Sequence, residues 1–440
     1  MDLAERVKVV SQRSWASWGV VVFLWAAFAY VWLLPLIRPR GLYLWGHYRL
    51  SDIFIGFPVG LATICATVVV LMPKQLRRKV ALRLVTLCIA ILAIVFAFDA
   101  VYTFGLLKIW QPNMYFDQSG VSRQHNLPDP DLGFVRKPNL SWHGSTSRHT
   151  RKVDFRTDQS GFRNAPGIER ADIVFIGDSY TEAPQVPEEE TFVQLVGEGT
   201  GQTVANLGIS AYGPQQAVVV LQRYGVKYQP KVAVWAIFEG NDLGDAQSYA
   251  LFRDNPGKAF VSLKQRYLDN SLMNRLFSLT LAEVPVVGRA AATMRFTDGS
   301  SQNVHLIYPA AMDQPVKKAV GMAETIKSIE AAHAICKSND IKLVVVFLPA
   351  MVRVMAPYLT FADQSGHDRF LTNDVVQHDT DFGSRVRKLA SDLGITFVDG
   401  FSVLRRQALI DNRKLFILND EHLDTEGHKI IAAEIIKALP

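Results

Sequence analysis

The stretch DIVFIGDSYTE, residues 172–182, decides the fold class of this chain. Four apolar residues follow Asp172, and an uninterrupted apolar run of this length is typical of a buried strand. Gly177-Asp178-Ser179 then ends the strand with small and polar residues. A serine hydroxyl therefore lies at the carboxyl edge of the predicted sheet, where open α/β sheets bind their ligands. Ser179 is either a capping residue of the next helix or a nucleophile.

From Ala171 onward, predicted strands alternate with predicted helices. We expect strands at Asp172–Ile176, Val204–Leu207, Val232–Phe238, Ile341–Leu348 and Ile395–Val398. We expect helices at Thr191–Glu198, Pro214–Arg223, Val316–Lys337, Ser384–Leu393 and Thr425–Leu439. This order predicts an α/β domain with a parallel sheet covered on both faces. Residues 243–312 lack the alternation and are expected to form an insertion, either a lid near the site or a peripheral helical addition.

Three further polar motifs lie at the ends of predicted elements. ANLGISAYG (205–213) and AIFEGNDLGD (236–245) follow strands, and LNDEHLDTEGH (418–428) precedes the final helix. Because the carboxyl ends of parallel strands meet at one edge of the sheet, we expect these motifs to converge on the serine. They contribute Gly208, then Gly240, Asn241 and Asp242, and finally Asp420 and His422.

These residue types suit acyl transfer. Ser179 needs a base to become a nucleophile, and His422 is the candidate base. Asp420 lies two residues before His422, so in an extended segment both side chains point the same way, and Asp420 can orient the imidazole. The backbone N–H groups of Ser179 and Gly208 and the side-chain amide of Asn241 are candidate donors to an oxyanion.

Each motif alone has an ordinary structural reading as a turn or a helix cap. His428, inside the predicted last helix, is the rival base and is expected to pack or to face solvent. His125, His143 and His149 have no metal-ligand spacing and are expected at the surface. The four motifs together, in order and each at the end of an element, favour the catalytic reading, without a metal or another cofactor.

The four motifs resemble those of the SGNH, or GDSL-type, hydrolases, and the resemblance covers about residues 171–440. It implies a flavodoxin-like three-layer α/β/α fold in which Ser179, Gly208, Asn241 and His422 are the defining residues. Gly177, Asp178, Gly240 and Asp242 complete the motifs.

The orienting acid departs from the commonest pattern of that family, which is Asp-x-x-His. Asn419 stands three residues before His422, and this chain has Asp420-x-His422 instead, a spacing found in some members and in related polysaccharide acyltransferases. Glu421 and Asp424 are the alternative orienting acids.

The first 110 residues contain three long apolar runs, about 18–37, 53–72 and 84–107. A membrane-spanning helix needs roughly 20 apolar residues, so residues 1–110 are expected to form a transmembrane region. Two alternatives remain open. The first run contains a possible signal-peptide cleavage site, Ala27-Phe28-Ala29. The second run is interrupted by Gly56, Pro58 and Gly60 and could be re-entrant.

The net charge of +6 is unevenly distributed. Residues 1–110 contain 12 Lys and Arg against 4 Asp and Glu, whereas residues 111–440 contain 35 against 37. The basic excess thus flanks the apolar runs, and no nucleic-acid partner is expected. The basic loop 74–83 favours a cytoplasmic position for that loop, which with three spans places the connector 111–170 and the domain 171–440 outside the inner membrane. Two spans would place them in the cytoplasm.

The sequence therefore predicts a membrane-anchored serine esterase acting on O-acyl, above all O-acetyl, esters of a cell-envelope glycan or a lipid-linked saccharide. One alternative is an O-acyltransferase for an exported polysaccharide. Three spans are too few to carry acyl groups across the membrane, so a transferase would need a membrane protein as acyl supplier. Related transferases can carry the His motif before the Ser motif, and the opposite order here favours the esterase. The third possibility is an inactive glycan-binding module.

Overall fold

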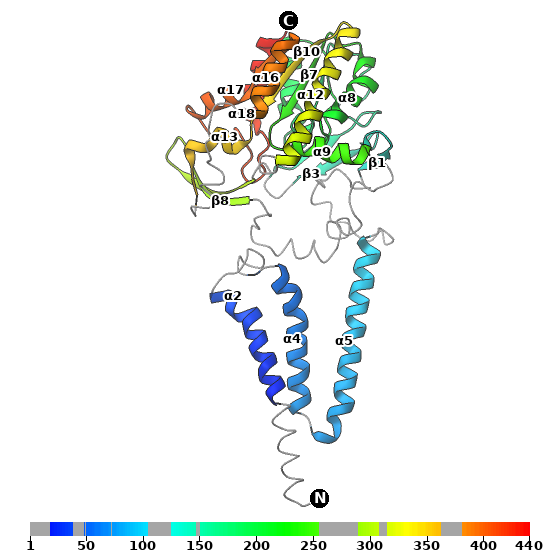
Figure 1. Ribbon diagram of the computed structural model, residues 1–440, viewed down its shortest axis with the longest axis vertical. Helices are drawn as coiled ribbons and strands as arrows, with labels where there is room; N and C mark the ends of the chain where they lie inside the picture. Colours follow the sequence, from blue (N-terminus) through cyan, green and yellow to red (C-terminus); the bar gives the residue numbers. More distant parts are fainter. Residues whose placement is uncertain are drawn as a thin grey trace, which may run out of the picture. The chain divides into compact units, whose positions relative to one another are not determined.

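The computed structural model describes residues 18–37, 48, 50–71, 73–103, 125–146, 150–254, 289–307, 315–361 and 381–440. These residues belong to two compact units: an N-terminal unit with the described residues up to 103, and a C-terminal unit with the described residues from 125 onward. Figure 1 shows the helices and strands of each unit.

The N-terminal unit is built of apolar helices. Residues 18–28 are helical and are followed by the π-helical turn η1 (Ala29–Leu33), α2 (Leu34–Ile37), α4 (Leu50–Leu71) and α5 (Lys74–Thr103). Trp32 joins the first helical stretch to α4, because its Nε1–H donates to the Gly56 carbonyl at 2.9 Å. A Cβ at Gly56 would lie 2.6 Å from the Trp32 ring, so this position has to remain a glycine for the contact to form.

Two of the three expected spans meet the length and composition needed to cross a membrane, Trp18–Ile37 and Arg78–Val101. The second run forms one continuous helix across Pro58, but its apolar part, Ile55–Leu71, is shorter than the other two. The third run begins earlier than the expected residue 84, and residues 104–107 lie outside the described residues. A bundle of about three spanning helices is therefore not established by these helices.

The C-terminal unit contains a five-stranded parallel sheet. Its strands are β5 (Ile173–Ile176), β6 (Val204–Asn206), β7 (Val232–Phe238), β10 (Lys342–Leu348) and β12 (Thr396–Asp399). All five expected strands are confirmed within a residue or two. Their spatial order is β12-β10-β7-β5-β6, with every pair parallel. Numbered along the chain, this is the order 2-1-3-4-5 of flavodoxin-like sheets, whose switch point lies between β5 and β7.

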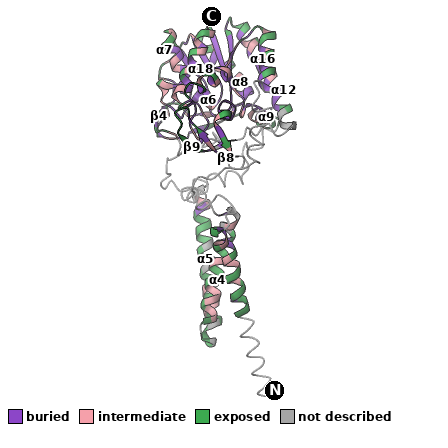
Figure 2. Cartoon of the chain, turned by 90° about the vertical axis from the view of Figure 1, so that its left-hand side faces the viewer, coloured by how far each residue is buried: buried purple, intermediate pink, exposed green. Residues whose placement is uncertain are grey.

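Helices cover both faces of this sheet (Figure 2). The helices are α7 (Phe192–Thr200), α17 (Gly400–Ala408) and α18 (Thr425–Ala438) on one face, and α8 (Pro214–Arg223), α12 (Pro315–Ser338) and α16 (Asp381–Leu393) on the other. Alternate residues of each strand face opposite layers, so Phe175 packs with the first set and Val174 with the second. The expected three-layer α/β/α arrangement follows directly from this alternation.

Several elements add to the three layers. An antiparallel sheet is formed by β8 (Arg289–Arg295), β9 (Ser301–Ile307) and β11 (Leu359–Phe361), and two hairpins by β1 (Asn126–Asp129) with β2 (Gly133–Arg136) and β3 (Ser141–Gly144) with β4 (Val153–Arg156). Short helices are α6 (Ser179–Glu182), α9 (Asp242–Arg253) and α13 (Met351–Met355), with 3-10 turns η2 (Glu188–Glu190), η3 (Gly225–Tyr228) and η5 (Ala356–Tyr358). Within the segment expected as an insertion, the described residues thus form α9 and the β8–β9 hairpin.

Candidate active site

The turn after β5 places Ser179 at the carboxyl edge of the sheet, beside the switch point. Gly177 has a φ of +151°, and a Cβ there would lie 2.4 Å from the Thr181 hydroxyl, so the turn requires glycine. Asp178, not Ser179, is the N-cap of α6: its carboxylate accepts a hydrogen bond from the Tyr180 N–H at 2.9 Å. The capping role is thereby filled, and the serine hydroxyl is available for another partner.

The serine hydroxyl is hydrogen-bonded to His422. The distance from Ser179 Oγ to His422 Nε2 is 2.8 Å, and His422 Nδ1 lies 2.7 Å from Asp420 Oδ1. The Asp420 side chain is 1% exposed and that of His422 18% exposed. The structure therefore brings together three residues that the sequence separates by 243 positions, in the order acid, imidazole, hydroxyl that activates a serine.

A tight loop before α18 orients the side chains of Asp420 and His422. The Ile417 N–H donates to the His422 carbonyl at 2.8 Å, and the Glu421 N–H donates back to the Ile417 carbonyl at 2.8 Å. Asn419 and Glu421 both have positive φ, 65° and 75°, a strained backbone for residues with a Cβ. The Tyr180 hydroxyl donates to the Glu421 carbonyl at 2.7 Å and so ties this loop to α6.

The electrostatics of His422 favour the imidazolium that forms during acyl transfer. Burial opposes the charged form, but the charge and hydrogen bond of Asp420, helped by the charge of Asp178, outweigh it and raise the pKa of His422. The neutral form, which serves as a base, thus becomes dominant only above the ordinary value of about 6.5.

The Gly208 loop packs closely against α6. A Cβ at Gly208 would lie 2.5 Å from the Thr181 Cβ and 2.6 Å from the Glu182 nitrogen, so only glycine fits. The Gly208 N–H donates to the Asn206 side-chain oxygen at 3.0 Å, and the Asn206 amide donates to the Thr181 carbonyl at 2.7 Å. Asn206, which the sequence analysis did not single out, therefore fixes the loop. Its oxygen accepts the Gly208 N–H that was expected to donate to an oxyanion.

Asn241 lies at the end of β7, as the N-cap of α9, but its side chain makes no capping bond. Its amide donates instead to the Asp245 carboxyl at 2.8 Å, and its Oδ1 is buried with no hydrogen-bond partner among the described residues. The Ser179 N–H, the first of α6, also makes no hydrogen bond within the part of the chain that the structure describes. The Asn241 side chain also forms a hydrogen bond with Asp178, so its second amide hydrogen faces the turn that carries Ser179, where an oxyanion would bind.

Three carboxyl groups lie around Asn241. Asp242 accepts a hydrogen bond from the Phe238 N–H at 2.9 Å, and burial followed by the charge of Asp178 raises its pKa well above the ordinary value. The same two causes raise the pKa of Asp245 to about 8. Burial also raises the pKa of Asp178, against the opposing effects of the Tyr180 N–H, the charge of His422 and a hydrogen bond with the Asn241 side chain.

A buried ion pair anchors the loop that carries Asn241. Glu239 accepts hydrogen bonds from Arg353 Nη1 at 2.6 Å and from the Ala350 N–H at 2.7 Å, and both charged side chains are at most 2% exposed. The Arg353 guanidinium also lies over the Phe401 ring, 4.3 Å from its centroid. An acid at the end of an apolar strand was the sequence signal for this pair, but its partner could not be found without the fold.

A second buried pair anchors α6. Arg136 donates from Nε and Nη2 to the two oxygens of Glu182, both at 2.8 Å, and lowers the pKa of that carboxyl in spite of its burial. The Ser210 N–H donates to Glu182 at 2.8 Å as well. Arg163 donates to the carbonyls of Glu182 and Val186, and burial lowers the pKa of its guanidinium to about 10. The segment expected to be a connector thus supports the turn that bears the serine.

The alternative acids and bases lie elsewhere. Asp424 caps α18 by accepting from the Thr425 N–H at 2.8 Å. His428 is buried and accepts from the Phe192 N–H at 3.1 Å, and burial followed by the charge of Arg163 lowers its pKa to about 3.

The histidines expected at the surface differ in exposure. His143 is exposed and pairs with Asp154 at 2.7 Å. His125 is buried, contrary to the expectation, because it lies against the β1–β2 hairpin, where its carbonyl accepts from the Lys137 N–H. His149 lies outside the described residues. Within those residues, no group of three or more His, Cys, Asp or Glu side chains is arranged to hold a metal ion.

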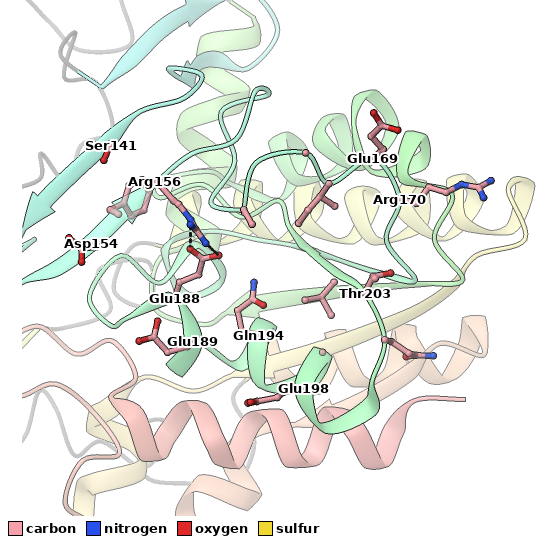
Figure 3. A pocket seen from close by; sticks show the side chains of 17 residues that line it. Ser141, Asp154, Arg156, Glu169, Arg170, Glu188, Glu189, Gln194, Glu198 and Thr203 are labelled. Carbon is pink, nitrogen blue, oxygen red and sulfur yellow. Dashed lines mark hydrogen bonds and ion pairs between the residues drawn. The ribbon is translucent and has the colours of Figure 1, made fainter.

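A cavity of about 950 Å³ lies between the β3–β4 hairpin and α7, and it contains none of the predicted site residues (Figure 3). Its lining is charged and of mixed sign, with Arg156 paired to Glu188 at 3.1 Å. Because a cavity lined by charged groups of both signs defines no ligand, the hydrogen-bonded serine remains the candidate site.

No family model matches this chain, and no curated protein matches it. Among solved structures, the chain is similar to a GDSL-like lipase from Bacteroides thetaiotaomicron, with 14% identity, coverage of 62% of this chain and 87% of that one, and a TM-score of 0.32. It is also similar to Axe2, an acetylxylan esterase from Geobacillus stearothermophilus, with 12% identity, coverage of 60% and 92%, and a TM-score of 0.33. A third similar structure is the psychrotrophic esterase EstA from Pseudoalteromonas sp., with 10% identity, coverage of 61% of this chain and 96% of that one, and a TM-score of 0.31. The chemistry has to be inferred from this chain's own side chains.

Proposed function

We propose that this chain is a membrane-anchored serine esterase of the SGNH type that hydrolyses O-acyl, above all O-acetyl, esters of a cell-envelope glycan or a lipid-linked saccharide. The observation that carries the proposal is the continuous hydrogen-bonded path from Asp420 through His422 to Ser179, with distances of 2.7 and 2.8 Å. A serine that only caps a helix would not require a hydrogen bond to an imidazole. A non-catalytic module would not require a carboxylate that orients that imidazole.

In the proposed reaction, Ser179 Oγ attacks the ester carbonyl while His422 Nε2 accepts the hydroxyl proton. Asp420 keeps Nδ1 protonated and stabilises the imidazolium. The oxyanion of the tetrahedral intermediate accepts hydrogen bonds from the Ser179 N–H and the Asn241 amide, whereas the Gly208 N–H donates to the Asn206 side-chain oxygen. His422 then protonates the leaving alcohol oxygen. Water, deprotonated by His422, attacks the acyl-enzyme and releases the acid.

The membrane location is supported by the surface of the N-terminal helices. Only 17% of the Trp18–Ile37 window and none of the Arg78–Val101 window is buried within the protein. Bulky side chains such as Phe23 and Ile94 are 71% and 68% exposed. A core helix of a soluble domain would bury these groups, and a continuous apolar surface of this extent is suited to lipid.

Reporter fusions test the orientation. Alkaline phosphatase joined to the carboxyl terminus should be active if the C-terminal unit lies outside the inner membrane. A fusion that is inactive, in cells where a fluorescent protein at the same position is bright, would place the site in the cytoplasm and remove envelope glycans as substrates.

Activity is tested on the full chain in detergent. Wild-type protein should hydrolyse p-nitrophenyl acetate and be labelled at Ser179 by a fluorophosphonate, and S179A should do neither. A folded wild-type protein without turnover or labelling would favour a glycan-binding module.

Mass spectrometry of surface glycans then separates the two reaction types. In cells carrying S179A, glycans that gain O-acetyl groups indicate an esterase. Glycans that lose them indicate an O-acyltransferase, which would draw its acyl groups from a membrane partner.

A further inference from the structure

Asn241 is an N-cap asparagine that does not cap its helix. An asparagine in that position ordinarily accepts a hydrogen bond from an N–H of the first helical turn. Here the side-chain amide is turned toward Asp245, one turn along α9, and the carbonyl oxygen is left buried without a partner among the described residues. A buried unpaired oxygen is unfavourable, so this orientation has to be enforced by the bond on the amide side.

We propose that Asp245 is a positioning residue for acyl transfer, which holds the Asn241 amide so that its second N–H points to the oxyanion. This inference rests on the proposed function. The amide has two hydrogens, and the 2.8 Å bond from Nδ2 to Asp245 Oδ2 uses one and fixes the plane of the group. The other hydrogen is thereby held toward Asp178, the residue next to the nucleophile, which forms a hydrogen bond with the Asn241 side chain.

The position of Asp245 is itself fixed by the fold. Its N–H donates to the Asn241 carbonyl at 2.9 Å, so both ends of the residue are tied to Asn241. Gly213, the N-cap of α8, approaches so closely that a Cβ would lie 2.8 Å from the Asp245 carbonyl carbon. The first turn of α9 therefore cannot shift toward α8 without a clash with the Gly213 backbone.

The charges around Asp245 add a pH dependence to this role. Two carboxyl groups lie near Asp245: Asp178, which precedes α6, and Asp242, which begins α9. The neighbouring residue on α8 is the uncharged Gln215. On α12, Glu324 is already paired with Arg253 at 3.1 Å. Burial and the charge of Asp178 raise the pKa of Asp245 to about 8, so Asp245 is a neutral acid at pH 7. Above that pH, its ionisation adds a negative charge close to the developing oxyanion and slows the reaction.

The test compares full-length variants in detergent, with p-nitrophenyl acetate hydrolysis and the rate of fluorophosphonate labelling as readouts. N241A should lower kcat by about 10²–10³-fold, as loss of an oxyanion donor does elsewhere. D245A should lower it by about 10–100-fold with little change in KM, because the donor is present but no longer aimed. The matched control is D254N, which removes an exposed carboxylate at the other end of α9 and should change neither readout.

Two measurements distinguish positioning from a general effect on folding. In the N241A background, D245A should cause no further loss, because Asp245 acts only through Asn241. D245N keeps an oxygen acceptor for the amide, so it should recover most of the rate lost in D245A and should remove the fall in activity above pH 8.

Two results would overturn the proposal while leaving the esterase intact: D245A at the wild-type rate, or a loss in D245A that persists in full beside N241A. If S179A retained the wild-type rate, the proposed function itself would be wrong and this inference would fall with it.

Discussion

The two sides of the candidate site are held together in different ways. On the nucleophile side, Ser179, His422 and Asp420 bond directly to one another. On the oxyanion side, Gly208 bonds to Asn206 and Asn241 bonds to Asp245, and the two pairs do not bond to each other. Asn206 and Asp245 are not expected to touch substrate.

This difference reflects what each side has to do. A proton moves along the nucleophile side, so its members need direct contact. The oxyanion donors have to point at a charge that exists only during the reaction, so neighbouring residues have to hold them in that orientation beforehand. We therefore expect the first side to fail completely when one member is removed, and the second side to fail in steps.

The largest effect is expected for S179A and H422A, each lowering kcat by about 10⁴–10⁶-fold. The double variant should be no slower than either single one, because the residues act as a unit. H143A, which removes an exposed histidine, is the control and should be as active as wild type. If the losses in kcat from S179A and H422A were additive, the nucleophile side would also fail in steps, and the difference between the two sides would disappear.

The next effect concerns the orienting acid. D420N should lower kcat/KM by about 10²–10⁴-fold. Asp420 raises the pKa of His422, so in wild type activity should rise with pH through a value above about 6.5. Without that charge, burial dominates and the acid limb should move to lower pH. The profile of kcat/KM from pH 4 to 9 measures both.

D424N is the control for the acid, because Asp424 caps α18 and should affect thermal stability more than the position of the acid limb. If D424N moved the acid limb and D420N did not, Asp424 would be the orienting residue.

A smaller loss is expected when the oxyanion side is loosened at Asn206. N206A removes the acceptor of the Gly208 N–H and the donor to the Thr181 carbonyl, so we expect kcat to fall about tenfold as the Gly208 loop loses its fixed orientation. Steady-state kinetics measure the change in kcat, and a thermal melting curve shows whether the variant is still folded. An increase in kcat would instead show that Asn206 keeps the Gly208 donor away from the substrate.

The smallest effect is expected at Tyr180, which joins the two sides. Its hydroxyl donates to the Glu421 carbonyl, and its ring stacks on Phe238 at 4.0 Å. Y180F keeps the ring and removes the hydroxyl, so we expect a two- to fivefold lower kcat and a loss of about 1 kcal/mol of stability. Thermal unfolding and kcat check this. A loss as large as that of D420N would mean that Tyr180 belongs to the proton path itself.

Much of the fold could be predicted because its signals are local. The buried strands are continuous apolar runs, and β7 was expected with its observed bounds. The β8–β9–β11 sheet was not expected, since β11 has three residues and pairs with a strand about 65 positions away in the chain. Strand pairing at that separation leaves no local pattern to detect.

Local sequence patterns predict which residues can meet: a serine, a glycine, an asparagine and a histidine, each placed by a strand end or a helix start at one edge of the sheet. They do so because strand periodicity and turn chemistry depend on neighbouring residues.

Which of these residues bond to one another, and which residues support them, depends on how the whole chain folds. Asp420 rather than Glu421 or Asp424 faces His422, and His428 is buried in the core. The buried pairs of Arg136 with Glu182 and of Arg353 with Glu239, separated by 46 and 114 positions, were likewise beyond reach. Hydrogen bonds and charge pairs depend on distances across the fold, and spacing along the chain does not predict those distances.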